Sequence, residues 1–250
     1  MSRPGAAALV AAALALGAPA AATAAGPVPP PDAAAAAAGL GYQQVSDETT
    51  HTVGAMVRRR VEVVSQPGSD GRRVAALRPA TYFGTTEVVL VLGVSTGDDG
   101  AWSFVRYPGL GDRIGWVPSA ALDTQPSVST RIVIDRARPR VRLYRHGALV
   151  FRAPAGVGAR RSPTPAGRYY VRERLVPASS NTVYGVLAFG LSAYSRYRTD
   201  WPGGGQVGLH GTNEPDLIPG HISNGCIRLH NRDIRRLDRL MSVGTPILIR

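Results

Sequence analysis

The segment QVGLHGTNEPDLIPGHISNGCIRL, residues 206–229, contains the most informative pattern of the 250-residue chain. It begins with a short apolar run that is typical of a strand, and this run ends in His210-Gly211-Thr212. Sixteen residues after His210 comes Cys226, the single cysteine of the chain. The turn-forming Ser223-Asn224-Gly225 directly precedes it, which predicts that Cys226 lies where a loop enters a strand.

A lone thiol with histidines nearby predicts nucleophilic chemistry. At its ordinary pKa near 8.5, only about 3% of a thiol is ionised at pH 7, so a neighbouring imidazole must take the proton. The resulting thiolate–imidazolium pair then lowers the pKa of the thiol. His210, His221 and His230 are the candidates for this base. We predict His210, because the end of a strand holds a side chain more firmly than a loop does.

The residues around Cys226 suit an acyl-transfer site. The backbone N–H groups of Gly225 and Cys226, next to Asn224, are predicted to stabilise the oxyanion of a tetrahedral intermediate. Arg228 lies two residues beyond Cys226 and therefore projects to the same side of a strand. It would bind a substrate carboxylate or carbonyl, or form a structural salt bridge. Three further residues are predicted to bind substrate or support the site: Ser223, Gly211 and Thr212.

Outward from this segment, residues 131–250 have the pattern of a β-rich unit. Strands are expected over 131–135, 140–145, 148–151, 167–172, 185–192, 206–210 and 246–249. His146-Gly147 is expected to form a hairpin turn. One helix is expected beside the reactive segment, because Asn231 can cap it, Ile234 and Leu237 share a face, and Gly244 can end it.

Residues 55–123 form a second β-rich unit. Apolar runs recur about every ten residues between Gly- and Asp-containing turns, which predicts a small barrel or sandwich. The closing phrase GWVPSAAL, residues 115–122, resembles the end of bacterial SH3-like domains. This resemblance implies a barrel of five or six strands. Trp102, Tyr107 and Trp116 are expected to pack in its core, and the alternative is that they line a ligand groove. A hinge is expected over 124–130, between the two units.

The composition excludes several classes of protein. Gly and Pro together make 49 residues, about a fifth of the chain, which argues against a helical bundle. All 29 basic side chains are Arg, so mechanisms that need a catalytic lysine are excluded. A single cysteine cannot form an internal disulfide or a Cys-rich zinc site, and no cluster of metal ligands is evident, so we expect no metal or cofactor.

The N-terminus is typical of a secretory signal peptide over residues 1–25. Arg3 supplies the positive charge, a short apolar run follows, and Ala22-Thr23-Ala24 offers a cleavage site. We therefore expect an exported protein, in the cell-wall space or outside the cell, with no stable membrane span unless the signal remains uncleaved. Residues 26–54 are rich in Pro and Ala and then polar, which predicts a disordered linker.

The positive charge is concentrated in the C-terminal half. Residues 131–250 carry 20 Arg against 7 acidic residues, a net charge of +13, whereas residues 26–130 carry 8 Arg against 10 acidic residues, a net −2. Such a surface suits an anionic cell-wall polymer, an anionic membrane or nucleic acid, or it only keeps the protein soluble. Nucleic acid is not expected, because no basic strand with interleaved aromatic residues and no recognition helix is present.

The motifs together resemble the YkuD-type L,D-transpeptidase family. The resemblance rests on His-Gly-Thr, the 16-residue spacing and Ser-Asn-Gly-Cys-Ile-Arg-Leu, together with RSPTPAGRY at residues 161–169 and the strand pair at 131–151. Asn224 departs from the pattern, since many members have a second histidine there. The implied architecture is mostly β: an SH3-like barrel, then a β-sandwich catalytic domain over residues 131–250 with one short helix after the catalytic cysteine.

The resemblance implies an enzyme that acts on the stem peptides of peptidoglycan. Cys226 would attack the third residue of a stem, expel the terminal D-Ala and pass the acyl group to an amine of a neighbouring stem, which gives a 3→3 cross-link. Water as acceptor would instead make an L,D-carboxypeptidase. The resemblance also implies that carbapenems acylate Cys226. A non-catalytic wall-binding protein is the remaining alternative, against which His210, Cys226 and Arg228 argue because all three are present.

Overall fold

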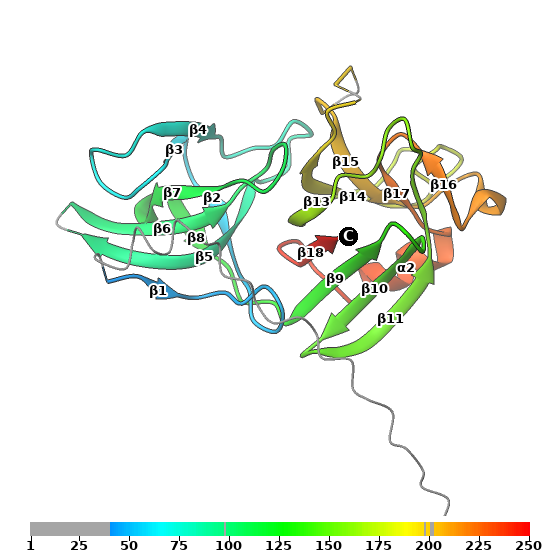
Figure 1. Cartoon of the computed structure of the whole chain (residues 1–250), viewed down its shortest axis with the longest axis horizontal. Coiled ribbons are helices and arrows are strands. Elements are labelled where there is room, and N and C mark those ends of the chain that lie inside the picture. The colour runs from blue at the N-terminus through cyan, green and yellow to red at the C-terminus, as the bar shows by residue number, and fades with distance from the viewer. Residues whose placement is uncertain (1–40, 98, 198, 201–202) are drawn as a thin grey trace, which may run out of the picture.

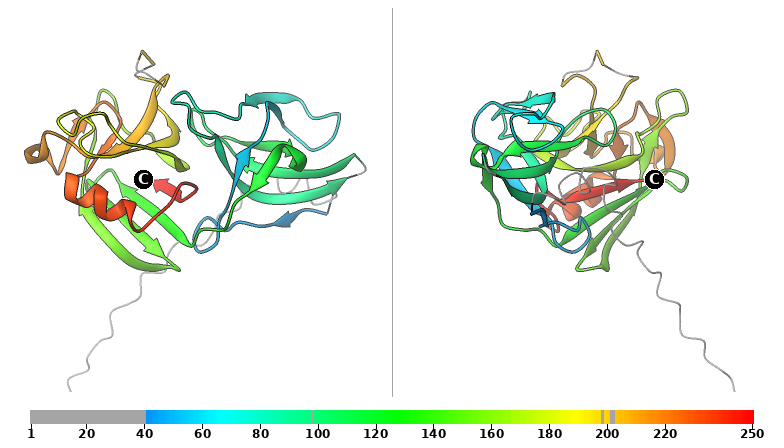
Figure 2. Two further views of the ribbon diagram at one scale, coloured as in Figure 1. Left: turned by 180° about the vertical axis from the view of Figure 1, so that it is seen from behind. Right: turned by 60° about the vertical axis from the view of Figure 1, so that its left-hand side comes forward.

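The computed structural model describes residues 41–97, 99–197, 199–200 and 203–250. The signal peptide expected at 1–25 and residues 26–40 of the expected linker lie outside these ranges. The chain forms two β-sheets, one of eight strands and one of ten. Figures 1 and 2 show them side by side, as an N-terminal unit (residues 41–124) and a C-terminal unit (residues 130–250).

The N-terminal sheet has the order β4-β3-β7-β6-β5-β2-β8, with β1 paired to β5. Its strands are β1 (Gln43–Gln44), β2 (Val53–Val57), β3 (Val61–Val64), β4 (Arg73–Leu77), β5 (Val88–Gly97), β6 (Gly100–Arg106), β7 (Ile114–Pro118) and β8 (Leu122–Thr124). A short 3-10 helix, η2 (Ser119–Ala121), precedes β8. Trp116 and Tyr107 are buried in its core, as expected, whereas Trp102 is only half-buried. The sheet exceeds the five or six strands expected, and the SH3-like resemblance stays a prediction.

The C-terminal sheet has the order β11-β10-β9-β18-β13-β14-β15-β17-β12-β16. Its strands are β9 (Thr130–Asp135), β10 (Arg140–Arg145), β11 (Ala148–Pro154), β12 (Gly156–Gly158), β13 (Gly167–Leu175), β14 (Ala188–Tyr194), β15 (Gln206–His210), β16 (Gly220–Ser223), β17 (Ile227–Arg228) and β18 (Pro246–Ile249). The mostly β prediction is confirmed. The hairpin turn at His146-Gly147 is also confirmed, because both residues have positive φ, as a two-residue turn between β10 and β11 requires.

Strand β13 converts this sheet into two packed layers. Its first half, residues 167–170, pairs with β18, whereas residues 171–175 pair with β14. A strand that changes partners in this way turns the corner between two layers. One apolar core then fills the space between the layers. The helix α2 (Asn231–Asp238) packs into the same core through Ile234 and Leu237, which are both fully buried.

The predicted linker over 26–54 is wrong for its last residues. Gln43 and Gln44 pair with β5, and the Tyr42 ring lies over Gly93, where any Cβ would collide with it. Ser46 Oγ donates to the Val91 carbonyl, 2.5 Å away, and accepts from the Val53 N–H. The segment looks polar and unpatterned because its partners lie about 50 residues further along the chain. The segment expected to be a hinge, residues 124–130, is also fixed by strand pairing, since Val128 pairs with Thr52.

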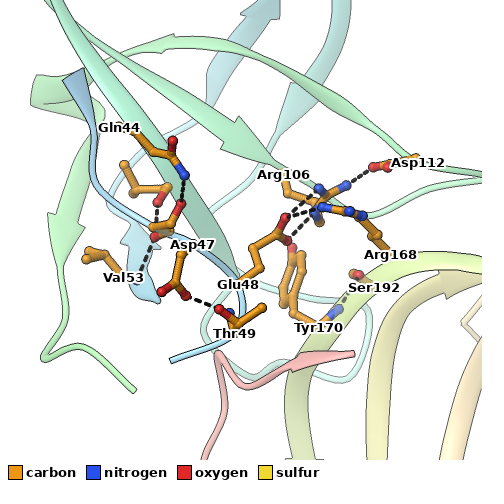
Figure 3. A network of polar contacts seen from close by, with 12 residues as sticks. Gln44, Asp47, Glu48, Thr49, Val53, Arg106, Asp112, Arg168, Tyr170 and Ser192 are labelled. Carbon is orange, nitrogen blue, oxygen red and sulfur yellow. Dashed lines mark hydrogen bonds and ion pairs between the residues drawn. The ribbon is translucent and has the colours of Figure 1, made fainter. Parts of the chain in front are cut away.

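Buried polar contacts join the two units. Glu48 binds the guanidinium groups of Arg106 and Arg168, and Arg106 also binds Asp112 (Figure 3). Beside them the fully buried Tyr170 donates its hydroxyl to the Val88 carbonyl, 2.8 Å away. The two units are therefore joined by an interface that contains hydrogen bonds and ion pairs.

A buried ion pair adds to this interface. Glu87 of the N-terminal unit and Arg172 of the C-terminal unit form two hydrogen bonds, and both side chains are less than a tenth exposed. Burial alone would lower the pKa of Arg172, but the Glu87 carboxylate raises it above its ordinary value. In the part of the chain that the structure describes, no helix is long and apolar enough to cross a membrane.

Candidate active site

Cys226 lies between β16 and β17, at the junction of a loop and a strand. The Ser223 hydroxyl accepts from the Gly225 N–H and donates to the Cys226 carbonyl, at 3.1 and 2.6 Å. Gly225 has a φ of 119°, a conformation that side chains with a Cβ rarely adopt. The Ser162 hydroxyl donates to the Asn224 carbonyl, 2.8 Å away. These bonds fix the loop that presents the thiol.

His210 is placed beside this loop by strand pairing. It is the last residue of β15, which runs parallel to β17 with Leu209 opposite Ile227 and His210 opposite Arg228. His210 Nδ1 lies 2.6 Å from the Gly211 carbonyl. Because a carbonyl can only accept, we assign the proton to Nδ1, which leaves Nε2 unprotonated and available as a base.

Gly208 brings the thiol and the imidazole together. A Cβ placed on this glycine would lie 3.2 Å from His210 Cδ2 and 3.7 Å from Cys226 Sγ, so both groups border the same small space. The Gly208 N–H also donates to Cys226 Sγ, 3.3 Å away. A hydrogen bond to sulfur favours the thiolate. Because Gly208 has no side chain, there is room for both reacting groups, and its N–H stabilises the thiolate form of Cys226.

Burial favours the neutral form of both reacting groups. Burial lowers the pKa of His210 to about 4, and the Arg228 guanidinium acts in the same direction. Burial also raises the pKa of the Cys226 thiol, which the Gly208 N–H and Arg228 only partly oppose. Burial therefore opposes the thiolate–imidazolium pair expected from the sequence, because it disfavours each of the two charges.

The expected pair of oxyanion donors is reduced to one. The Gly225 N–H is already bound to the Ser223 hydroxyl, so it does not point to a free position. For the Cys226 N–H, no acceptor is found among the residues that the structure describes. Asn224 is exposed at the rim, and its carbonyl is bound to Ser162.

Asn231 ties the strand that carries His210 to the helix. It was expected to cap α2, but the helix begins at Asn231 and His230 occupies the cap position without a side-chain bond. The Asn231 Oδ1 instead accepts from the Thr212 N–H at 3.1 Å and from the Val186 N–H at 3.3 Å. A Cβ on Gly211 would collide with this oxygen. Gly211 and Thr212 thus support the site through their own backbone atoms, which lie against the Asn231 side chain.

Of the three candidate histidines, His210 is the one that borders the space at Gly208 together with the thiol. His221 is exposed, and its Nε2 lies 3.0 Å from the Arg136 carbonyl. His230 lies 3.4 Å from the Asp233 carboxylate, at the start of α2. Neither residue lines a cavity that contains Cys226.

Of the two roles considered for Arg228, the structure shows the salt bridge, and the substrate-binding role stays a prediction. Arg228 Nη1 lies 2.6 Å from Glu214 Oε2, so it does form a salt bridge. The side chain also lines a cavity of about 180 Å³ that contains His210 and Cys226. A guanidinium in this position can attract the carboxylate of a bound peptide.

Two cavities meet at the thiol. The first, of about 180 Å³, is lined in part by Tyr184, Ser195, Gln206, His210, Asn224, Cys226 and Arg228. The second, of about 400 Å³, shares Tyr184, Gln206, His210 and Cys226, and its other walls include apolar side chains and Phe83 of the N-terminal unit. The ring of Tyr184 meets that of His210 edge-on at 5.1 Å.

Sequence reasoning did not identify Ser162, Tyr184, Gln206 or Gly208 as site residues. A signal existed for Gly208, which lies two residues before His210 on the same face of the strand. For the other three, the contacts join segments that are 20 to 60 residues apart, and no local pattern marks them.

Comparisons with known proteins agree with the motifs. The model of the YkuD family, the L,D-transpeptidase catalytic domain, matches residues 129–249. The YkuD protein of Bacillus licheniformis is 30% identical over 123 residues, which cover 49% of this chain and 67% of that protein. The YkuD protein of Bacillus subtilis is 32% identical over 96 residues, which cover 38% of this chain and 51% of that protein.

A solved structure was also found. The NMR structure of the catalytic domain of the Enterococcus faecium L,D-transpeptidase is 24% identical, with a TM-score of 0.36, and the match covers 48% of this chain and 96% of that one.

The matches to L,D-transpeptidases imply an enzyme of the acyltransferase type. From the sequence matches, the chain belongs to the YkuD family of L,D-transpeptidases.

Proposed function

We propose that this protein is a peptidoglycan L,D-transpeptidase whose nucleophile is Cys226. The observation that carries the proposal is the shared space at Gly208, where the thiol and the unprotonated edge of His210 meet beside two cavities. Its substrates are the stem peptides of peptidoglycan, and no cofactor is needed for this chemistry.

In the first half-reaction the enzyme becomes acylated. His210 Nε2 takes the proton from Cys226 Sγ as the sulfur attacks the carbonyl carbon of the third stem residue. The Cys226 N–H stabilises the oxyanion of the tetrahedral intermediate. The bond to the terminal D-Ala then breaks, and the imidazolium returns its proton to the departing amine. A thioester on Cys226 remains.

The second half-reaction transfers the acyl group. An amine of a neighbouring stem attacks the thioester carbonyl, His210 takes the proton from this amine, and Cys226 leaves as a thiolate that is reprotonated by His210. The product is a 3→3 cross-link. Proton transfer within the neutral pair accompanies attack, because burial disfavours either charge before substrate binds.

The setting of this reaction is also a proposal. We place the protein outside the cytoplasm, at the cell wall, on the strength of the signal-like N-terminus and the net charge of +13 over residues 131–250. The Arg-rich half suits the anionic polymers of the wall as a second partner. Residues 55–123 are proposed to be an SH3-like domain on the resemblance of their closing segment, residues 115–122.

Incubation with a disaccharide-tetrapeptide, followed by mass analysis, tests the reaction. A cross-linked dimer with release of one D-Ala supports the transpeptidase. A tripeptide product alone would show that water is the acceptor and would contradict the transfer step. An unchanged substrate would contradict the enzyme function as a whole.

A further inference from the structure

The loop between Thr81 and Thr85 of the N-terminal unit is bound to the C-terminal unit through one carboxylate. Thr81 Oγ1 and Thr85 Oγ1 donate to Glu173 Oε2, at 2.8 and 2.7 Å. The Thr81 N–H also bonds the Thr85 carbonyl, 2.8 Å away, which closes the loop. Thr81 and Glu173 are both buried, so these bonds replace water around the carboxylate.

The same carboxylate reaches the strand that carries His210. Glu173 Oε1 accepts from Gln206 Nε2 at 2.9 Å, and this amide also donates to the Leu191 carbonyl at 3.1 Å. A Cβ on Gly190 would lie 2.6 Å from Gln206 Nε2 and 2.7 Å from Glu173 Oε1, so a glycine is needed where they meet. Gln206 begins β15 and lines both cavities at the thiol.

Phe83 is the side chain that this anchored loop presents to the site. Its backbone N–H donates to Thr81 Oγ1 at 3.2 Å, and its ring borders the 400 Å³ cavity that contains Cys226 and Gln206. A Cβ on Gly203 would lie 3.2 Å from this ring. The Phe83 side chain is 43% exposed, and an apolar ring that stays this exposed beside a nucleophile is available to a ligand.

The neighbouring Tyr82 provides a contrast. Its ring packs edge-on against Phe83 with 5.1 Å between centroids, but it is 69% exposed and lines neither cavity at Cys226. Two adjacent aromatic side chains of one loop therefore face different surroundings.

We propose that Phe83, which the loop from Thr81 to Thr85 holds in place, is a substrate-binding residue of the active site. Phe83 packs against an aliphatic part of the peptide substrate, whose other contacts in the cavity include Leu175, Val176 and Pro177. Glu173 is the positioning residue that holds the loop and Gln206 in one arrangement. The inference rests on the proposed function, and it makes the N-terminal unit a part of the catalytic groove rather than only a tether.

The first test compares Phe83→Ala with Tyr82→Ala in the full-length protein. Two rates are measured: conversion of the disaccharide-tetrapeptide, and alkylation of Cys226 by iodoacetamide, which is too small to need the groove. We expect Phe83→Ala to lower kcat/KM about tenfold, mainly through KM, because burial of an aromatic surface is lost. Its alkylation rate should stay within about twofold, as should both rates of Tyr82→Ala.

Equal kcat/KM values for the two variants would overturn the inference. So would a fall in the alkylation rate of Phe83→Ala in proportion to its turnover, since that result indicates a general disturbance of the site. If Cys226→Ala still converts the substrate, the proposed function itself fails, whereas an inactive Cys226→Ala with an unaffected Phe83→Ala rejects this inference alone.

The second test breaks the anchor and leaves Phe83 in place. The double variant Thr81→Val and Thr85→Val removes both hydroxyl donors at nearly constant volume, so we expect KM to rise severalfold with little change in kcat. The matched variant Thr81→Ser and Thr85→Ser keeps the hydroxyls and should recover most of the loss. If the serine variant is as impaired as the valine variant, or if the valine variant keeps its KM, Glu173 does not position the loop.

Discussion

Two buried pairs in this protein respond to burial in opposite ways. Cys226 and His210 border the same space at Gly208, neither is in an ion pair in the described part of the chain, and burial favours the neutral form of each. Glu87 and Arg172 are each less than a tenth exposed, but each directly contacts the opposite charge, and the carboxylate raises the pKa of the guanidinium. Loss of water thus favours the neutral form of a group whose neighbours are neutral. It leaves a group charged when a counter-ion is in direct contact.

The contrast assigns the reaction to one pair and the contact between the two units to the other. The neutral pair keeps its proton until substrate arrives, and the charged pair holds the two units together. The substitutions below test these two pairs and their surroundings.

Removal of the thiol should have the largest effect. Cys226→Ser replaces sulfur by oxygen at nearly constant volume, but a hydroxyl is far less nucleophilic at neutral pH. We expect turnover to fall by about a thousandfold or more, with an unchanged free energy of unfolding. Product formation by mass spectrometry and denaturant unfolding are the measurements, and cross-linking above a few per cent of the wild-type rate would contradict the role of Cys226.

Removal of one charge from the interface should mainly lower stability. Glu87→Gln leaves the buried Arg172 without its counter-ion, which we expect to lower the free energy of unfolding by about 3–5 kcal/mol. The control is Arg58→Gln, whose partner Asp123 is half exposed, so that a loss within about 1 kcal/mol is expected. Similar losses for both variants in denaturant titrations would contradict the importance of burial here.

The pH dependence of stability should report on His210. In the unfolded chain this imidazole takes up a proton below about pH 6.5, whereas the folded protein resists protonation until about pH 4. The free energy of unfolding should therefore decrease as the pH falls from 6.5 to 4, and this residue should contribute about 3 kcal/mol of that decrease.

His210→Gln supplies the reference for this titration, because it lacks the ionisable group. The difference in unfolding free energy between wild type and variant should change with pH in the stated direction. A difference that does not vary between pH 6.5 and 4 would show that His210 titrates normally.

A smaller effect on kcat/KM is expected at Arg228, which lines the same cavity as Cys226 and His210. Arg228→Lys keeps the charge but loses the planar fork, so kcat/KM should fall about tenfold or more if Arg228 binds a substrate carboxylate. Glu214→Gln breaks the same exposed ion pair and should change kcat/KM by no more than about twofold. If Glu214→Gln is as impaired as Arg228→Lys, the salt bridge rather than the substrate explains the effect.

Local patterns were sufficient for much of this site. The strand that ends at His210 and the turn before Cys226 are both contiguous in the chain, and the structure places them as expected. Strand alternation likewise located β9 to β11 and β18. Such features depend on neighbouring residues, so a single sequence reveals them.

Contacts between distant segments could not be predicted in this way. Thr81 meets Glu173 across 92 residues, and Asn231 reaches Val186 across 45, so neither pairing leaves a periodic signal. The effect of burial on the protonation of the site was missed for the same reason. The pKa of His210 depends on how completely other segments bury it, and burial is a property of the fold.

The most direct test of the account is to identify the atom that carries the acyl group. The protein is mixed with the disaccharide-tetrapeptide, quenched in acid, and digested for peptide mapping by mass spectrometry. We predict an adduct of the substrate minus D-Ala on the peptide that contains Cys226, absent in Cys226→Ala and cleaved by hydroxylamine as a thioester. An adduct on another residue, or release of D-Ala by Cys226→Ala, would contradict the central claim.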